Sequence, residues 1–544
     1  MTNAIHGAKR DGCEEGVESL LRSETRGRGE LCVKVGHASP DLPRRFLKKL
    51  LENIRIKQAE RRKTTSKRFA ATGGRWRRER RVANPAAGDY YRCMKPVTDP
   101  AILDAYLLDA SNTRGAAEAL VRPESAAEVA EVVRHCQAAG IPLTVTARRT
   151  STTAAPIPDG GWLLSTEKMC TLHALDDADA GIVLGDYQNQ VEAAGMFFPP
   201  DPTSRNECSL GGAVACNASG ARSYHYGPTR PWIRQVEVVL PDGTVMRVDR
   251  TTPSPWPVPV WREPSVKTAA GYFPATNLLD LLIGAEGTLG IITRVWTHLL
   301  PLPVHVLAFL AFFPTRASML EFLAEARLGR HDRTAPLQPR CLEYFDRRSL
   351  ELIRSRVPLS NADCALLIEV EHTGEPPLEV WFDAMVRHGA LVDDTIVADD
   401  EAGLAKLHAI RHALPAAVNE IIARTGVRKI GTDFAVPDAA LVEMLERYDD
   451  TGMPAVCFGH IGDNHLHLNF LPDTPEQSSD ARDRYMALAR RAVELGGTVS
   501  AEHGIGRVKR AHLAMMVGPA QIDAWRAMRR LADPQEILGR GVMV

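Results

Sequence analysis

Residues 198–227 read Phe-Pro-Pro-Asp-Pro-Thr-Ser-Arg-Asn-Glu-Cys-Ser-Leu-Gly-Gly-Ala-Val-Ala-Cys-Asn-Ala-Ser-Gly-Ala-Arg-Ser-Tyr-His-Tyr-Gly, and residues 283–292 read Ile-Gly-Ala-Glu-Gly-Thr-Leu-Gly-Ile-Ile. Closely spaced glycines let backbone N–H groups approach a phosphate without interference from a Cβ atom. Either stretch alone is better explained by tight turns in a β-rich domain. Two such loops far apart in the sequence are better explained by one large ligand between them. Neither has the Gly-x-Gly-x-x-Gly spacing after a strand, which disfavours a Rossmann nicotinamide site.

Regular elements are predicted on both sides of these loops. Ser125 and Glu128 form a capping box before a helix that ends at Gly140. Strands are predicted over residues 141–147, 235–240, 305–313 and 364–370, and helices over residues 316–328, 377–388, 438–447 and 481–495. The proline-rich stretch at 299–303 reads as a domain junction, followed by an α+β second domain.

Length and composition are those of a globular protein. The chain has 544 residues, 44% hydrophobic and 24% charged, with a net charge of −1, and this length predicts two or three domains. The sequence contains no run of about 20 apolar residues, so no membrane span is predicted. The N-terminus lacks the apolar core of a signal peptide. Ten cysteines without a Cys-x-x-Cys pair disfavour a disulfide scaffold, a zinc ribbon and an iron–sulfur cluster. A cytoplasmic location is therefore expected.

The first 93 residues differ from the remainder. Residues 44–81 carry 16 Lys and Arg against three acids. One interpretation is a nucleic-acid-binding arm. We favour a disordered extension, or an over-long start with the folded protein beginning near Met94, and expect no nucleic-acid partner.

A histidine-rich segment follows the second domain's helices. Residues 455–471 read Ala-Val-Cys-Phe-Gly-His-Ile-Gly-Asp-Asn-His-Leu-His-Leu-Asn-Phe-Leu. If Asp463-Asn464 forms a two-residue hairpin loop, His460 and His467 become cross-strand partners with Cβ atoms about 4.5–5.5 Å apart. Two imidazoles that close suit one metal ion, and His465 shares the face of His467. Polar surface histidines explain this cluster alone equally well.

A second motif favours the metal interpretation. Residues 500–507 read Ser-Ala-Glu-His-Gly-Ile-Gly-Arg. Glu502 can complete a His-His-carboxylate triad that leaves positions open for substrate. Adjacent side chains do not easily point the same way, so His503 is expected to face the substrate as an acid or base. Zinc and manganese both suit such a triad.

In combination, these motifs resemble a known family. Residues 122–129, 199–204, 211–220 and 284–291 resemble the FAD-binding domain of the vanillyl-alcohol oxidase superfamily, in the branch of D-lactate dehydrogenase, the glycolate oxidase flavoprotein subunit and D-2-hydroxyglutarate dehydrogenase. The resemblance covers about residues 101–544. It implies an α+β fold: a two-part, PCMH-type FAD-binding domain, an α+β substrate (cap) domain with an antiparallel sheet, and a C-terminal segment that returns to the active site. The corresponding ranges are an N-terminal extension at 1–93, the FAD-binding domain at 94–300, the cap domain at 301–480 and the C-terminal segment at 481–544.

In that family these segments line FAD. The cofactor-binding residues implied here are Arg149, Thr150, Ser151, Pro200, Asp201, Thr203, Ser204, Gly211, Gly212, Asn217, Ser219, Gly220, Tyr226, Gly227, Glu286, Gly287, Gly290 and Ile291. Where the family has a glycine-rich phosphate loop, this chain has Ala-Arg-Arg-Thr-Ser-Thr-Thr at 147–153, whose arginines and hydroxyls could hold a pyrophosphate. Because this loop has no histidine, non-covalent FAD is expected.

The resemblance also assigns roles at the two histidine motifs. It implies that His460, His467 and Glu502 bind the metal and that His503 is catalytic. The sequence departs from the family at Asn464-His465, where Gly-Asn is commoner. Arg411 matches an arginine associated with the substrate carboxylate, although a structural salt bridge explains it nearly as well; Lys429 is a weaker candidate.

The expected activity is FAD-dependent oxidation of a small 2-hydroxy acid (of the D-lactate, glycolate or D-2-hydroxyglutarate type) to the 2-oxo acid. Hydride would pass from substrate C2 to flavin N5 while the metal polarises the hydroxyl. The electron acceptor, whether a cytochrome, a quinone or an electron-transfer flavoprotein, is left open, as is peripheral membrane association. Two alternatives are a transferase like alkyl-dihydroxyacetonephosphate synthase, which uses FAD without net oxidation, and a nucleic-acid-binding protein that uses the basic arm.

Overall fold

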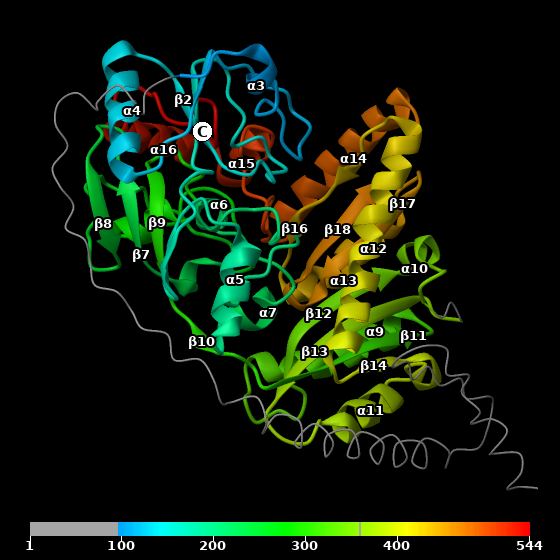
Figure 1. Ribbon diagram of the computed structural model, residues 1–544. Helices are drawn as coiled ribbons and strands as arrows, with labels where there is room; N and C mark the ends of the chain where they lie inside the picture. Colours follow the sequence, from blue (N-terminus) through cyan, green and yellow to red (C-terminus); the bar gives the residue numbers. More distant parts are fainter. Residues whose placement is uncertain (1–95, 358–360) are drawn as a thin grey trace, which may run out of the picture.

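The computed structural model describes residues 96–357 and 361–544, which form two lobes (Figure 1). The predictions for residues 1–93, including the basic segment at 44–81, lie outside the described residues. One lobe contains three smaller sheets, with three, five and two strands, from residues 96–301. The other contains an eight-stranded sheet and its helices.

The first lobe begins with a three-stranded parallel sheet of order β1-β3-β2. Its strands are β1 (Ala119–Val121), β2 (Leu143–Thr146) and β3 (Trp162–Ser165). Helix α4 (Ala126–Ala139) packs on this sheet, with Ser125 accepting a hydrogen bond from the Glu128 N–H and Gly140 in the left-handed region. The predicted helix and both of its caps are confirmed.

A five-stranded antiparallel sheet completes the first lobe, in the order β4-β5-β9-β7-β8. Its strands are β4 (Leu172–Ala174), β5 (Asp177–Asp179), β7 (Ile233–Val239), β8 (Val245–Asp249) and β9 (Ile291–Thr297). The other elements of this lobe are α3 (Pro100–Asp104), α5 (Leu184–Ala193), β6 (Met196–Phe197), α6 (Leu210–Cys216), α7 (Ser223–Tyr226), α8 (Leu278–Leu282) and β10 (Leu300–Pro301). The first glycine-rich segment, at 198–227, thus contains α6 and α7, and the second connects α8 to β9.

The second lobe is an antiparallel sheet of order β14-β11-β13-β12-β17-β18-β15, with β16 also paired to β18. Its strands are β11 (His305–Phe313), β12 (Pro339–Asp346), β13 (Cys364–His372), β14 (Ile396–Ala398), β15 (Ile430–Gly431), β16 (Phe434–Ala435), β17 (Ala455–His460) and β18 (His465–Phe470). The helices are α9 (Arg316–Arg327), α10 (Arg347–Leu352), α11 (Leu378–Arg387), α12 (Glu401–Thr425), α13 (Leu441–Asp449) and α14 (Pro475–Glu494). This fold class is the one predicted.

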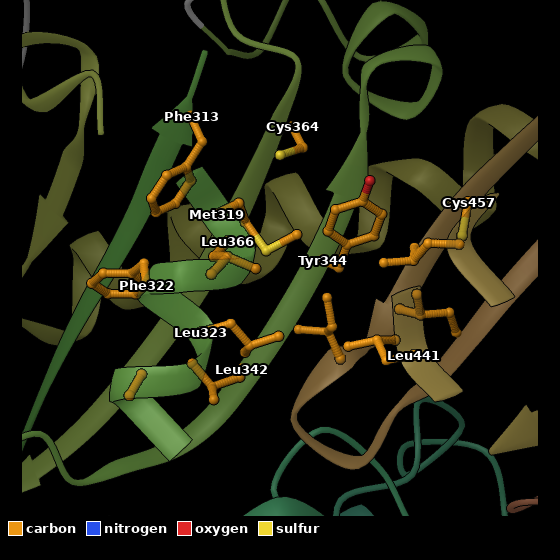
Figure 2. Close-up of a cluster of buried hydrophobic side chains, with 14 of the residues drawn as sticks. Phe313, Met319, Phe322, Leu323, Leu342, Tyr344, Cys364, Leu366, Leu441 and Cys457 are labelled. Carbon is orange, nitrogen blue, oxygen red and sulfur yellow. The ribbon is translucent and has the colours of Figure 1, made fainter. Parts of the chain in front are cut away.

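Both faces of the large sheet are covered, because side chains of alternate strand residues point to opposite faces. On β11, Leu307, Phe309, Ala311 and Phe313 join one hydrophobic cluster with residues of α9, α11, α13 and α14. Figure 2 shows part of this cluster, in which Phe313, Met319 and Phe322 lie beside Leu342 and Tyr344 of β12. The intervening residues of β11 pack with α10 and α12 on the other face.

The C-terminal segment returns to the first lobe. Helices α15 (Arg510–Val517) and α16 (Pro519–Ala532) lie against the elements of residues 96–300 (Figure 1). Trp525 of α16 is fully buried there and meets the Tyr272 ring at a centroid distance of 5.9 Å. Residues 498–509, which include the second histidine motif, therefore cross between the lobes. Among the described helices, none has the length and apolar character that crossing a membrane requires.

Candidate active site

The histidine hairpin forms, but its predicted register is wrong. A 3-10 turn over Ile461–Asp463, closed by Asn464 in the left-handed region, connects β17 to β18. His460 consequently pairs with His465, and His467 pairs with Phe458. A side-chain period of two still keeps the histidines on one face of the hairpin, so the His460 and His467 rings lie 5.7 Å apart.

His460 and His467 are oriented in the same way. His460 Nδ1 contacts Glu343, and His467 Nδ1 lies 3.0 Å from the carbonyl oxygen of Thr432. In each ring the other nitrogen, Nε2, lies 3.3 Å from an oxygen of Glu502. A histidine that donates one N–H to an oxygen acceptor presents the other nitrogen as a metal ligand.

Glu502 lies between the two lobes. Its Oε2 accepts a hydrogen bond from Lys267 at 2.8 Å and is 3.4 Å from Ser219 Oγ, both in the first lobe. Burial disfavours the charged carboxylate, yet Lys267 and His460 outweigh this effect and hold the pKa of Glu502 well below its usual range. Lys267 binds Oε2, whereas Oε1 lies 3.3 Å from His467 Nε2, where both atoms could bind one metal ion.

Asp433, which sequence reasoning missed, organises the second motif. It is fully buried and accepts hydrogen bonds from Lys509 Nζ at 2.6 Å, Ser500 Oγ at 2.8 Å and the backbone N–H groups of Glu502 and His503. His503 Nδ1 lies 3.3 Å from the same carboxylate. A carboxylate with this many donors is already satisfied, so Asp433 positions the motif.

His503 lies beside the metal-ligand candidates, closer than predicted. Its Nε2 is 3.8 Å from Glu502 Oε1, so the expectation that these neighbours project apart is wrong. The local chain is held by Asp433, which turns both side chains toward the hairpin. Burial lowers the pKa of His503 to about 4 despite the opposing effect of Asp433. Its imidazole is therefore neutral near pH 7, as a general base must be.

Two groups of described residues have metal-ligand geometry. One comprises His460, His465, His467 and Glu502, and the other comprises Asp433, His467 and His503. In both groups the donor atoms lie within 4.8 Å of one another. The first group has the stronger case because the oxygens of Asp433 already accept several hydrogen bonds. The predicted ligands His460, His467 and Glu502 all belong to this group.

A cavity of about 530 Å³ adjoins these residues, and both Glu502 and His503 line it. Most of the predicted cofactor-binding residues also line it. They are Arg149, Thr150, Ser151, Thr203, Ser204, Gly211, Gly212, Ser219, Glu286, Gly287, Gly290 and Ile291. The segments 147–152, 203–219 and 286–292 therefore meet around one space, although they are far apart in the sequence.

Six predicted cofactor-binding residues do not line the cavity: Pro200, Asp201, Asn217, Gly220, Tyr226 and Gly227. Several have structural partners instead. The Asn217 side chain accepts the Arg230 backbone N–H, and the Tyr226 hydroxyl contacts Glu371. A Cβ at Gly220 would lie 2.1 Å from the carbonyl oxygen of Asp201, so this glycine permits a close backbone approach.

The residues present fit a large phosphate-containing cofactor. Gly287 lines the cavity with φ +74°, and an added Cβ would make only ordinary contact with Val145 at 3.8 Å, so the backbone conformation rather than crowding favours glycine there. Thr150, Ser151 and Thr203 supply hydroxyls to the same cavity. Arg149 also lines the cavity, and its guanidinium carbon lies 4.4 Å from the centroid of the Tyr106 ring. Hydroxyls, an arginine and exposed peptide groups are the donors a pyrophosphate requires.

Glu286 connects this cavity to the second motif. Its carboxylate accepts hydrogen bonds from the backbone N–H groups of Ile505 and Gly506, each at 2.7 Å. Burial raises the pKa of Glu286 to about 7 although these two hydrogen bonds oppose the shift. The contact fixes the segment after His503 against the first lobe.

Arg411 is placed beside the metal-ligand group and does not line the cavity; its neighbour His412 does. Arg411 Nε donates to Glu343 at 2.6 Å, and Glu343 also contacts His460. Burial alone would raise the pKa of Glu343, but His460 and Arg411 lower it to about 2. Glu343 was missed; the signal was a carboxylate between the apolar residues Leu342 and Tyr344 of strand β12, where an unpaired charge is rarely buried.

The comparisons with known proteins agree with this geometry. Residues 117–249 match the family model described as "FAD binding domain", and residues 302–543 match "FAD linked oxidases, C-terminal domain". The glycolate oxidase subunit GlcD of Bacillus subtilis (strain 168) is 27% identical over 445 residues, which cover 78% of this chain and 88% of that protein. The mitochondrial D-2-hydroxyglutarate dehydrogenase of Bos taurus is 29% identical over 465 residues, covering 81% and 80%.

Two further comparisons extend this result. A D-lactate dehydrogenase of Archaeoglobus fulgidus is 28% identical over 441 residues, covering 78% of this chain and 91% of that protein. A solved structure of alkyldihydroxyacetonephosphate synthase has the same fold, with a TM-score of 0.57 and 17% identity over 79% of this chain and 77% of that one. The chain therefore belongs to the FAD-linked oxidases, with their FAD-binding and C-terminal domains, and it is similar to the glycolate oxidase subunit and the two dehydrogenases named above.

Proposed function

We propose that the protein oxidises a small 2-hydroxy acid to the 2-oxo acid, with FAD as the oxidant and a divalent metal ion at the substrate. One observation supports this most strongly. Glu502 and His503 line the same cavity as the glycine-rich segments of the FAD-binding domain. A metal-ligand group and a neutral imidazole thus lie beside the expected cofactor space. The relatives' names, which include glycolate oxidase, D-lactate dehydrogenase and D-2-hydroxyglutarate dehydrogenase, favour substrates of this class.

In this proposal His460, His467 and Glu502 hold the ion. Their donor atoms come from two strands of the second lobe and from the segment that crosses between the lobes, and Glu343 and Thr432 fix the two imidazoles. When bound, FAD supplies a hydride acceptor and the ion supplies a positive charge that polarises the substrate hydroxyl. Zinc and manganese both accept two nitrogen donors and one oxygen donor.

His503 is the proposed base. Asp433 lies 3.3 Å from Nδ1, so a proton on that nitrogen leaves Nε2 able to accept the substrate's hydroxyl proton. The side chain is 32% exposed, and the residue lines the cavity. Asp433 itself is buried and acts by holding the imidazole in one orientation and tautomer.

The substrate carboxylate requires a cation. Only Nε of Arg411 is bound to Glu343, which leaves the terminal nitrogens of its planar fork for a carboxylate. Lys429 is the second candidate; its ammonium donates to Asn469, which lies on the same face of β18 as His467. Burial lowers the pKa of Lys429 to about 8, so its charge is retained at neutral pH.

We further propose that FAD is bound non-covalently and that turnover requires an electron acceptor of the cytochrome, quinone or electron-transfer flavoprotein class. The loop at 147–153, where a covalent link would be formed in some relatives, contains no histidine. The likeness to alkyldihydroxyacetonephosphate synthase supports the fold alone. It therefore gives no reason to prefer a transferase activity over the oxidation.

An anaerobic spectral titration tests the proposed function. The full chain, loaded with FAD and zinc, is mixed with glycolate, D-lactate and D-2-hydroxyglutarate, and with L-lactate as the control for stereochemistry. We expect loss of the oxidised flavin absorbance with at least one of the three acids, and formation of the matching 2-oxo acid. Unchanged absorbance with every acid would contradict the proposal, and a transferase would show no net flavin reduction.

A further inference from the structure

His465 lies inside the proposed metal site although the three-ligand assignment gives it no role. It begins β18 directly opposite His460. The side chain is fully buried. Its ring centroid is 5.3 Å from that of His460 and 4.4 Å from that of His467. The three imidazoles therefore form one cluster on one face of the hairpin.

His465 also places one ring nitrogen toward Glu502 and the other toward an oxygen acceptor, but with the two nitrogens exchanged relative to His460 and His467. Its Nε2 lies 2.9 Å from Asp433 Oδ1, and its Nδ1 lies 3.7 Å from Glu502 Oε2. If Nε2 carries the proton toward Asp433, Nδ1 presents a lone pair to the space beside Glu502. This is the arrangement by which a carboxylate orients a metal-bound imidazole.

A purely structural role leaves both ring nitrogens of His465 without a hydrogen bond among the described residues, although no part of the ring is exposed. Nε2 at least lies 2.9 Å from the Asp433 carboxylate, whereas the nearest acidic oxygen to Nδ1 is 3.7 Å away, on Glu502. Leaving a buried polar atom unpaired costs about 1–3 kcal/mol. If His465 had only a packing role, the folded protein would therefore be more stable with an apolar side chain at this position. A metal ion provides the missing partner.

We propose that His465 is a fourth protein ligand, so that three imidazoles and the Glu502 carboxylate hold the metal ion. This inference rests on the proposed function, which assigns an ion to the other three residues. The four donor atoms lie within 4.8 Å of one another. Zinc–ligand bonds of about 2.0–2.1 Å place two ligand atoms roughly 3.4–4.2 Å apart. Small side-chain movements would therefore bring the four donor atoms to coordination distance.

The fourth ligand has two consequences. Three imidazoles favour zinc over manganese, because manganese prefers carboxylate, carbonyl and water oxygens. Four protein donors would fill a tetrahedral zinc site, so a substrate oxygen would bind only by expanding the coordination to five. His465 thereby makes the site both tighter and more selective for nitrogen-preferring metals.

His465→Asn tests this inference, since asparagine keeps a hydrogen-bond donor toward Asp433 and removes the imidazole. The full chain with FAD is stripped with a chelator, and zinc chloride or manganese chloride is titrated against a chromophoric chelator. We expect zinc affinity to fall at least 100-fold, more than the roughly 10–100-fold cost of losing an outer partner of a ligand. Manganese affinity should change less. The control His412→Asn, an exposed histidine that lines the cavity outside the ligand group, should keep the wild-type zinc affinity.

X-ray absorption of the zinc-loaded wild type tests the same point without a variant. Three imidazoles in the coordination shell support the inference, and two overturn it. If His460→Ala abolishes zinc binding while His465→Asn retains wild-type affinity, His465 is not a ligand and the proposed function stands. If wild-type protein binds no zinc, both the fourth ligand and the proposed metal site are wrong.

Discussion

The imidazoles of His467 and His503 are stacked, with ring centroids 5.4 Å apart and planes inclined by 20°. One residue lies in a strand of the large sheet, and the other lies in the segment that crosses to the first lobe. The stacking places a proposed metal ligand directly beside the proposed base. A substrate hydroxyl bound at the ion would therefore lie within reach of His503.

Replacement of His503 should separate these two roles. His503→Asn removes the base and leaves His460, His467 and Glu502 in place. We expect flavin reduction to slow by about 10²–10⁴-fold, as is typical for a lost general base, with metal content unchanged. Stopped-flow reduction beside metal analysis measures both quantities. Loss of the metal in this variant would assign His503 to the ligand set instead.

Arg411 is predicted to bind the substrate carboxylate. Arg411→Met removes a charge-assisted hydrogen bond worth about 1.5–3 kcal/mol, so KM should rise roughly 10–100-fold with a smaller change in kcat. Arg424→Met, at an exposed position of the same helix, is the matched control. Weakened metal binding with an unchanged KM would show that Arg411 acts only by holding Glu343.

Glu286 should make stability depend on pH. Its folded-state pKa of about 7 exceeds the ordinary value of 4.5 because burial favours the neutral acid. The folded state therefore binds this proton more tightly, and the resulting stability is full below about pH 4.5 and is lost as pH rises to about 7. Over this window the free energy of unfolding should fall by about 3 kcal/mol more in wild type than in Glu286→Gln.

Urea unfolding of the FAD-loaded protein at pH 5 and at pH 7.5 measures the effect of Glu286. The control variant Glu420→Gln, at an exposed position of α12, should follow wild type. Parallel pH profiles for wild type and Glu286→Gln would mean that Glu286 titrates near its ordinary pKa in the folded protein.

Acid precipitation should release the flavin. We expect yellow cofactor in the supernatant after trichloroacetic acid treatment, because no histidine lies in residues 147–153 to form a covalent link. Chromatography of the supernatant should identify the compound as FAD. Yellow colour that stays with the protein pellet would refute the non-covalent attachment.

Local sequence patterns predicted much of the fold. The strand at 305–313 has the predicted limits, and the helix after Ser125 has the predicted caps. In contrast, α12 was not predicted, although it is the longest helix of the second lobe and carries Arg411. Its interior contains Pro415, which ordinarily disfavours a helix because proline lacks the N–H donor. Packing on the sheet stabilises it nonetheless, through residues such as Leu414 and Val418.

The site was only partly predictable because its members come from distant strands. Period-two alternation identified the face shared by His465 and His467, but not the loop geometry. Asn464 adopts the left-handed conformation after a 3-10 turn, which lengthens the connection and moves the register. Glu343 and Asp433 meet this hairpin through tertiary contacts alone. Nothing in their local sequence specifies those partners, so only the assembled sheet reveals them.

The most direct test of the account compares wild type with His460→Ala. Both proteins are analysed for bound metal and FAD spectrum, and then for anaerobic flavin reduction by the 2-hydroxy acid that bleaches the wild type. We predict that His460→Ala loses the metal and the reduction together while its FAD spectrum is unchanged, because the cofactor is held by the other lobe. A variant that lacks the metal but reduces its flavin at the wild-type rate would contradict the central claim.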